Sequence, residues 1–265
     1  MPETWQPERP MARRLADESS IPNQGLRALY EDPATPRALG SEPARYQAEV
    51  IALLLEAIGR PRALLDVGCG DGSTAVAIRT RLAEHGWRPA IIGLDWSSVA
   101  AGEALSRGVP VVRGTADRGG LPFRSASVEV VVVSEMIEHV VDTDSVLAEA
   151  LRVLVPGGVL VLSTPNLAAW YNRVLLTAGI QPVFSEVSLK AIYGRPGREV
   201  VGHLRLFTRR ALVGLLEATG FEQVEIVGAP YHDVPRPFRP LDRLLCRVPS
   251  LSSILVASAR RPRSR

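Results

Sequence analysis

Short apolar runs alternate with helical segments along most of this chain, and this alternation limits its possible folds more than any other feature. Runs this apolar are typical of strands buried on both faces, which occur where helices cover both sides of a mostly parallel sheet. The pattern therefore predicts a doubly wound α/β fold. The expected strands are residues 63–67, 90–94, 109–112, 128–133, 159–163, 222–227 and 254–258.

Length and composition favour a soluble globular protein. The 265 residues are 46% hydrophobic and 22% charged, with a net charge of +3, which suits one large domain. No run approaches the roughly 20 apolar residues of a membrane span, and the first residues lack the apolar core of a signal peptide. Cys69 and Cys246 have no CxxC spacing. We therefore expect a cytoplasmic location.

The chain divides into an arm, a domain and an insertion. Residues 1–45 are rich in Pro, Glu and Arg and are expected to form an irregular N-terminal arm, with a helix over 45–58 opening the domain at 46–265. Residues 166–203 break the alternation. A connection of that length commonly carries function, so we expect an insertion that covers the substrate. Its aromatic residues are Trp170, Tyr171, Phe184 and Tyr193.

The stretch ALLDVGCGDGSTAVAI places three glycines between a strand and a helix. Glycines at such a turn let the backbone bend sharply and let a ligand lie against the main chain. A dinucleotide fingerprint would have Gly or Ala at Ser73. Asp66, before Gly68 and Gly70, would repel a pyrophosphate and suit a cationic ligand. The loop therefore favours a ligand other than a dinucleotide.

Acidic residues also follow the next two strands. Asp95 is placed to accept both hydroxyls of a ribose, Trp96 to lie against a base, and Asp117 to accept an exocyclic amine. Each acid has a structural alternative: Asp66 and Asp95 as helix caps, and Asp117 as a turn residue. Three acids at the ends of three successive strands indicate one shared binding site.

Together these motifs resemble the class I S-adenosylmethionine-dependent methyltransferase superfamily. The similarity is carried in order by LLDVGCGDG, GLDWS, TADRGGLPF, VVVVSEMIEHVVD and RVLVPGGVLVLSTPN. It implies a Rossmann-like, seven-stranded sheet whose last strand is antiparallel, with S-adenosyl-L-methionine as methyl donor. By resemblance, Asp66, Gly68 and Gly70 line the methionine moiety and Asp95 binds the ribose. The same resemblance places Trp96 on the adenine, Asp117 at the adenine amine and Ser134 beside the methyl group.

The segment SEMIEHVVD admits three interpretations. If Glu135 begins a helical turn, Glu138 and His139 lie on the same side of it. Acidic residues there can simply favour a helix N-terminus. Alternatively, His139 is a catalytic general base oriented by Glu138. In the third interpretation, Glu135, Glu138 and His139 are metal ligands, together with His203 from GHLRLFTRRAL.

This ExxEH…H pattern resembles two families of metal-dependent methyltransferases. One is the ubiquinone-pathway O-methyltransferases, the nearer branch, and the other is the small-RNA terminal 2′-O-methyltransferases. A bound cation orients a hydroxyl nucleophile and lowers its pKa. Two carboxylates and two imidazoles can hold Mg²⁺, Mn²⁺, Fe²⁺ or Zn²⁺, and the sequence does not select among them.

The predicted acceptor is a small molecule with a hydroxyl, such as a catechol-like ring or a natural product. RNA is the less favoured partner, because Lys plus Arg (31) nearly balance Asp plus Glu (28), whereas RNA binding favours a basic groove. A metal-free enzyme with His139 as base stays open. Weak peripheral membrane contact through residues 235–256, where Phe238 and Leu241 lie beside arginines, is also compatible with the sequence.

Overall fold

The computed structural model describes residues 41–59, 61–117, 120–197 and 200–263. Most of the predicted arm therefore lies outside the described residues. Helix α2 (Ser41–Ile58) begins inside the range predicted as arm. The sequence placed this helix from residue 45 because its apolar periodicity starts late, and the helix buries Ala48, Ile51 and Leu55.

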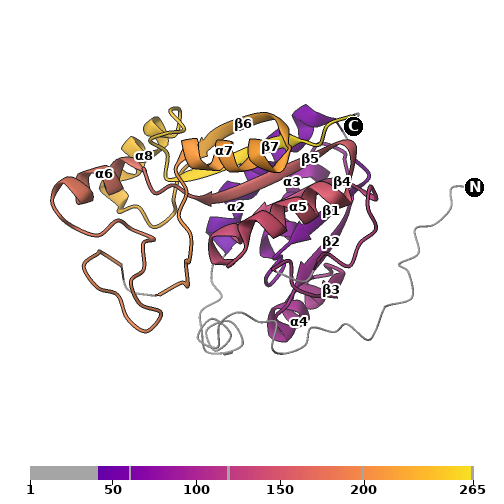
Figure 1. Ribbon diagram of the computed structural model, residues 1–265, viewed down its shortest axis with the longest axis horizontal. Helices are drawn as coiled ribbons and strands as arrows, with labels where there is room; N and C mark the ends of the chain where they lie inside the picture. Colours follow the sequence, from indigo (N-terminus) through magenta and orange to yellow (C-terminus); the bar gives the residue numbers. More distant parts are fainter. Residues whose placement is uncertain (1–40, 60, 118–119, 198–199, 264–265) are drawn as a thin grey trace, which may run out of the picture.

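Seven strands form one sheet in the order β3-β2-β1-β4-β5-β7-β6 (Figure 1). The first five pair in parallel, and β7 runs antiparallel to both β5 and β6. The predicted fold class is therefore confirmed. The strands are β1 (Ala63–Val67), β2 (Ala90–Asp95), β3 (Val111–Arg113), β4 (Val128–Ser134), β5 (Leu154–Pro165), β6 (Glu222–Ala229) and β7 (Ile254–Arg260).

Successive residues of β4 face opposite sides of the sheet, as strand geometry requires. Val131 and Val133 pack with helices α5 (Thr143–Val153) and α7 (Arg209–Thr219). Val130 and Val132 pack on the other side with α2 and α3 (Ser73–Glu84). Helix α4 (Ser98–Ser106) adds Ala104 to that second layer. Both faces of the sheet are thus covered, which explains the unbroken apolar runs.

Strands β2, β4, β6 and β7 extend one or two residues beyond their predicted ends, and two further strands begin at residues other than those predicted. Strand β5 begins at Leu154 rather than at residue 159, because the chain around Pro156 and Gly157 joins the sheet with a register shift against β4. Strand β3 covers only Val111–Arg113, because Val109 packs into the core and Pro110 precedes the strand.

The insertion predicted at 166–203 contains a helix, α6 (Trp170–Thr177), which the sequence pattern did not predict. The proline-rich segment before β7 also folds locally, into η3 (Arg236–Phe238) and α8 (Arg239–Leu245). Buried Asp242 joins the two segments by accepting hydrogen bonds from Trp170 Nε1 at 2.9 Å and from the backbone of Tyr231 at 3.1 Å. Helices α6 and α8 extend together beyond one end of the sheet (Figure 1).

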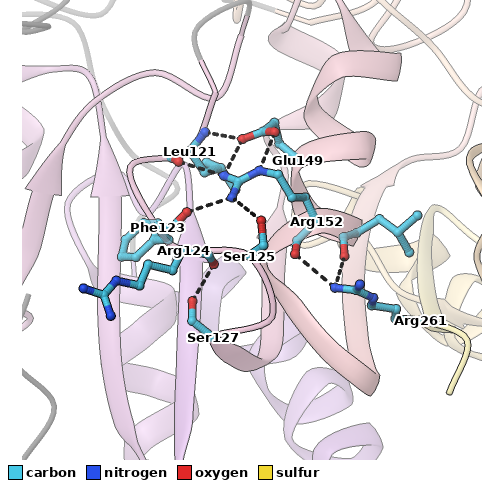
Figure 2. Close-up of polar contacts among 9 residues, drawn as sticks. Leu121, Phe123, Arg124, Ser125, Ser127, Glu149, Arg152 and Arg261 are labelled. Atoms are coloured by element: carbon cyan, nitrogen blue, oxygen red, sulfur yellow. Dashed lines mark hydrogen bonds and ion pairs between the residues drawn. The ribbon is translucent and has the colours of Figure 1, made fainter. Parts of the chain in front are cut away.

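An arginine fixes the loop that leads into β4 (Figure 2). Arg152 of α5 pairs with Glu149 at 2.7 Å and donates to the carbonyls of Leu121 and Phe123. Glu149 in turn accepts the backbone N–H of Leu121 at 2.6 Å.

Among the helices that the structure describes, none combines the length and apolarity that crossing a bilayer requires.

Candidate functional site

The loop after β1 turns through three glycines in the left-handed region. Gly68, Gly70 and Gly72 have φ values of 74°, 53° and 78°. A Cβ at Gly68 would lie 2.3 Å from Met136 Cγ, whereas one at Gly70 would meet no protein atom within 4 Å. Gly70 lines a cavity of about 1830 Å³, described below. The glycines therefore allow a tight turn at Gly68 and leave open space at the cavity wall beside Gly70.

Asp95 ties this loop to the end of β2. Its Oδ2 accepts the N–H of Gly70 at 2.8 Å, and its Oδ1 accepts the N–H of Ser97 at 2.9 Å. Asp95 lines the cavity but is not the cap of α4, because the N-cap is Ser97. Asp66 caps no helix either, since the N-cap of α3 is Gly72. These two capping alternatives are wrong.

Asp66 lies behind the loop, buried and outside the residues that line the cavity. Burial, and secondarily the charge of Asp95, raise the pKa of Asp66 to about 7. Among the described residues, none hydrogen-bonds to its Oδ2. The contact with a methionine moiety that was expected for Asp66 would thus be indirect, and the carboxyl is only partly ionised at neutral pH.

Asp117 holds the backbone of a distant segment, whereas the structural alternative considered from the sequence was a local turn. Its Oδ2 accepts the N–H of Val141 at 3.1 Å and its Oδ1 that of Asp142 at 3.1 Å. Each carboxylate oxygen has a second acceptor position, so a role at an adenine amine remains compatible with these contacts. Trp96 and Ser134 also line the cavity, and Ser134 Oγ lies 3.1 Å from Ser163 Oγ.

One cavity of about 1830 Å³ connects these groups with the segment SEMIEHVVD and with the insertion. The glycine loop and Asp95 form one wall, and the histidines His139 and His203 form another. The outer wall combines apolar and aromatic side chains with charged ones such as Lys190, Arg195 and Asp233. It includes Trp170, Tyr171, Val174, Phe184, Tyr231 and Phe238. The cavity is therefore large enough for a nucleoside-bearing ligand and a second molecule.

The helix-start interpretation of SEMIEHVVD is wrong. Glu135 has a φ of 50°, outside the helical region, and the next residues form only the 3₁₀ turn Ile137–His139. The following helix, α5, begins at Thr143 with Asp142 as its cap. Glu138 is fully buried rather than at an exposed helix end. A carboxylate carries a large desolvation cost there, so its presence needs a chemical explanation.

A cluster of three side chains lies beyond the carboxyl-terminal end of β4: Glu138, His139 and His203. Each offers a ligand atom, and these atoms all lie within 4.8 Å of one another. The carbonyl of Glu138 accepts the N–H groups of Leu204 and Arg205, at 2.7 and 3.0 Å. These bonds bring the distant His203 to the EH pair. Three of the four predicted metal residues are thus together, whereas Glu135 is not part of this group.

Both rings of the cluster are held through Nδ1. His139 Nδ1 lies 3.1 Å from Gly202 O, and His203 Nδ1 lies 3.1 Å from Phe184 O. A carbonyl oxygen can only accept, so each Nδ1 carries the proton and each Nε2 carries a lone pair. Burial lowers the pKa of His139 to about 3, with help from His203, and that of His203 to about 4. Both imidazoles are neutral at pH 7.

Glu138 supplies the carboxylate of the cluster. Its Oε2 accepts the hydroxyl of Thr164 at 3.0 Å. Its Oε1 lies 3.9 Å from His139 Nε2 and has no hydrogen bond from any described residue. Burial and the neighbouring Glu135 raise the pKa of Glu138 well above its usual range. Neutral imidazoles fixed by carbonyls and a buried carboxylate oxygen without a donor form a donor set that fits a divalent cation.

Several residues of the site had no signal in the sequence. Thr164 contacts Glu138 from β5, and Glu186 supports His203 from the insertion. Phe184, predicted only as an aromatic residue of the insertion, supports His203 through its backbone carbonyl. His232 also lines the cavity, whereas His85 is exposed beyond the end of α3.

Comparison with known proteins agrees with this geometry. The sheet topology, with a cavity-lining glycine loop after β1, defines an α/β protein of the Rossmann-like class. A family model described as a methyltransferase domain matches residues 40–226, which is most of the chain. The chain therefore belongs to this methyltransferase-domain family, and the superfamily resemblance seen in the sequence is confirmed.

Named relatives include S-adenosylmethionine-dependent enzymes. A probable S-adenosylmethionine-dependent methyltransferase of Mycolicibacterium smegmatis is 31% identical over 63% of this chain and 54% of its own length. The norajmaline N-methyltransferase of Rauvolfia serpentina is 32% identical over 39% of this chain and 36% of its own. The chain thus spans about half or less of the length of the curated relatives it matches.

Solved structures share the fold at low sequence identity. A Thermotoga maritima methyltransferase, described as a possible histamine N-methyltransferase, has a TM-score of 0.57 and 20% identity, covering 83% of this chain and 91% of its own. A methyltransferase from Haloferax volcanii, solved with its activator Trm112, has a TM-score of 0.58 and 16% identity, covering 87% and 95%. These similarities support the fold assignment alone.

Proposed function

We propose that this protein transfers the methyl group of S-adenosylmethionine to a hydroxyl of a small molecule, with a divalent cation at Glu138, His139 and His203. The observation that carries the proposal is the convergence of these three side chains on the cavity that the glycine loop also lines. Membership of the methyltransferase-domain family supports S-adenosylmethionine as the methyl donor, and the cluster supports the binding of a divalent cation.

The cofactor wall fits an S-adenosyl ligand. Gly70 leaves open space at its Cβ position, Asp95 presents a carboxylate at the cavity surface, and Trp96 lies beside it. S-adenosylmethionine carries an electrophilic methyl group on a positively charged sulfonium. We propose that Asp95 binds the ribose and Trp96 packs on the adenine. Asp66, Gly68 and Asp117 would shape and support this wall, and Ser134 would lie at its acceptor end.

The cluster suits a hydroxyl acceptor. A divalent cation, when bound, lowers the pKa of a coordinated hydroxyl and orients it. The chain supplies two neutral imidazoles and the carboxylate of Glu138 for such an ion, and Glu135 adds negative charge nearby. This set agrees with the proposed likeness to the ubiquinone-pathway O-methyltransferases. Mg²⁺, Mn²⁺, Fe²⁺ and Zn²⁺ are all compatible with it.

The alternative of a metal-free enzyme with His139 as base has less support. A base works best when its pKa lies near the operating pH, and the pKa of His139 is lowered to about 3. An RNA acceptor is also less favoured, because Lys plus Arg (31) nearly balance Asp plus Glu (28). One relative, the norajmaline N-methyltransferase, is named for a small-molecule acceptor, which agrees with a small acceptor here.

Titration calorimetry with Mg²⁺, Mn²⁺ and Zn²⁺ tests this proposal, with S-adenosylhomocysteine bound. We expect one ion per chain in the wild type and its loss in both Glu138→Gln and His203→Ala. Glu149→Gln is the matched control, because Glu149 lies in the Arg152 network away from the cavity. Equal ion binding in wild type and His203→Ala would exclude the three-ligand site.

A further inference from the structure

The carboxylate of Glu186 holds the backbone that precedes and includes His203. Glu186 Oε1 accepts the N–H of Val201 at 2.8 Å, and Oε2 accepts the N–H groups of Gly202 and His203 at 2.8 and 3.1 Å. Arg195 Nη2 pairs with Oε1 at 3.0 Å. The Glu186 and Arg195 side chains are only 2% and 5% exposed. We call this set of contacts the Glu186 clamp.

The clamp reaches both histidine rings of the cluster. Gly202, whose N–H it binds, offers the carbonyl that receives His139 Nδ1–H. His203, whose N–H it also binds, points its own Nδ1 at the carbonyl of Phe184, two residues before Glu186. Glu186 therefore fixes both Gly202, which accepts the bond from the His139 ring, and the backbone of His203.

A buried carboxylate that accepts three backbone N–H groups is more than ordinary loop packing. The backbone from 201 to 203 turns through Gly202 at a φ of 84°, a conformation that leaves successive N–H groups directed at one acceptor. The contacts of Leu204 and Arg205 with the Glu138 carbonyl anchor only the far side of His203. The His203 N–H belongs to the same peptide unit as the Gly202 carbonyl, so its bond to Glu186 orients that carbonyl toward His139.

We propose that Glu186 is a positioning residue, which keeps His139 and His203 in the tautomer with Nε2 as the ligand atom. The insertion would thus complete the cluster as well as cover the cavity. This inference rests on the proposed function for its importance in catalysis. The clamp itself, however, can be tested without any ion or acceptor.

The test compares Glu186→Gln with the matched control Glu149→Gln. Glu149 also pairs with an arginine and accepts a backbone N–H, so both variants lose the charge of a paired carboxylate. In Glu186→Gln, one side-chain oxygen is replaced by an NH₂ group that cannot accept the backbone N–H groups. Glu186→Asp, with its carboxylate withdrawn by one methylene, is the second variant if the first does not fold.

The first readout is the tautomer of each histidine, from ring ¹⁵N correlation spectra of the metal-free protein. The chain has four histidines, so His85 and His232 serve as internal references. We expect His139 and His203 to be Nδ1–H tautomers in the wild type and in Glu149→Gln, and mixtures in Glu186→Gln or Glu186→Asp. Unchanged His139 and His203 signals in folded Glu186 variants would overturn the proposal.

The second readout is the affinity for Zn²⁺ or Mn²⁺. Loss of a group that orients metal ligands commonly reduces affinity about 10- to 100-fold, and we expect this range in Glu186→Gln against no change in Glu149→Gln. Equal affinity in both variants would count against the clamp. Because the tautomer spectra need no ion, a wild type without metal binding would contradict the proposed function while the spectra still decide on Glu186.

Discussion

Thr164 donates its hydroxyl to Oε2 of Glu138 at 3.0 Å, and both side chains are fully buried. The bond links the end of β5 to the 3₁₀ turn after β4. Among the described residues, Thr164 is the side chain that donates to Oε2, and no residue donates to Oε1. Thr164 therefore sets the orientation in which Oε1 is offered to the cluster.

Thr164→Val should weaken both the fold and the metal site. The isosteric change leaves a buried carboxylate oxygen without a donor, which costs about 1–3 kcal/mol, and we expect that loss in the free energy of unfolding from urea titrations at pH 7. Affinity for a divalent ion should fall as well. Thr164→Ser keeps the hydroxyl and is the control. Equal stability of the Val and Ser variants would show that the bond contributes nothing.

Asp95→Ala should reduce affinity for S-adenosylhomocysteine by on the order of 10- to 100-fold, because hydrogen bonds to charged groups contribute about 1.5–3 kcal/mol. Calorimetry measures this directly. Asp142→Asn is the control, since Asp142 caps α5 and is not among the residues that line the cavity. An Asp95→Ala affinity as high as that of the control would remove the ribose assignment.

Gly68→Ala and Gly70→Ala separate the two roles of the glycine loop. Both positions have positive φ, so each alanine costs about 1–2 kcal/mol in stability. At Gly68 the new methyl also collides with Met136, so we expect the larger loss of melting temperature there. At Gly70 the methyl would occupy ligand space, so cofactor affinity should fall more than stability. Indistinguishable melting temperatures would contradict the close contact at Met136.

Local patterns were enough to predict the sheet and the glycine turn after β1. The runs at β1 and β4 are apolar because both faces are covered, and the glycines of DVGCGDG follow a strand as the turn requires. His203 was predicted because GHLRLFTRRAL supplies the second histidine of the ExxEH…H pattern. In each case the signal lies within a few neighbouring residues.

The supports of the cluster depend on contacts between distant segments, which leave no local pattern. Glu186 lies in a stretch without periodicity and binds backbone atoms, which any sequence supplies. The spacing ExxEH suggested a helical turn from Glu135, yet its φ of 50° excludes one. Helix α6 was missed because its eight residues bury only Asn172 fully, so no apolar stripe marks it.

Protonation of Asp66 should make stability depend on pH. Its pKa is about 7 in the folded protein against 3.8 for an ordinary aspartate, so between these values the unfolded chain releases a proton that the folded chain keeps. The free energy of unfolding should therefore fall as pH rises from about 4 to about 7, by up to about 1.4 kcal/mol per pH unit. Above pH 7 this contribution is constant.

Asp66→Asn isolates that contribution, because Glu138 acts in the same direction and is unchanged in the variant. Urea titrations at several pH values give the difference between variant and wild type, which should shift in favour of the variant as pH rises from 4 to 7. A difference that is constant with pH would mean that Asp66 ionises in the folded protein as it does in water. The raised pKa follows from burial behind the glycine loop, so such a result would also imply that water reaches this carboxyl.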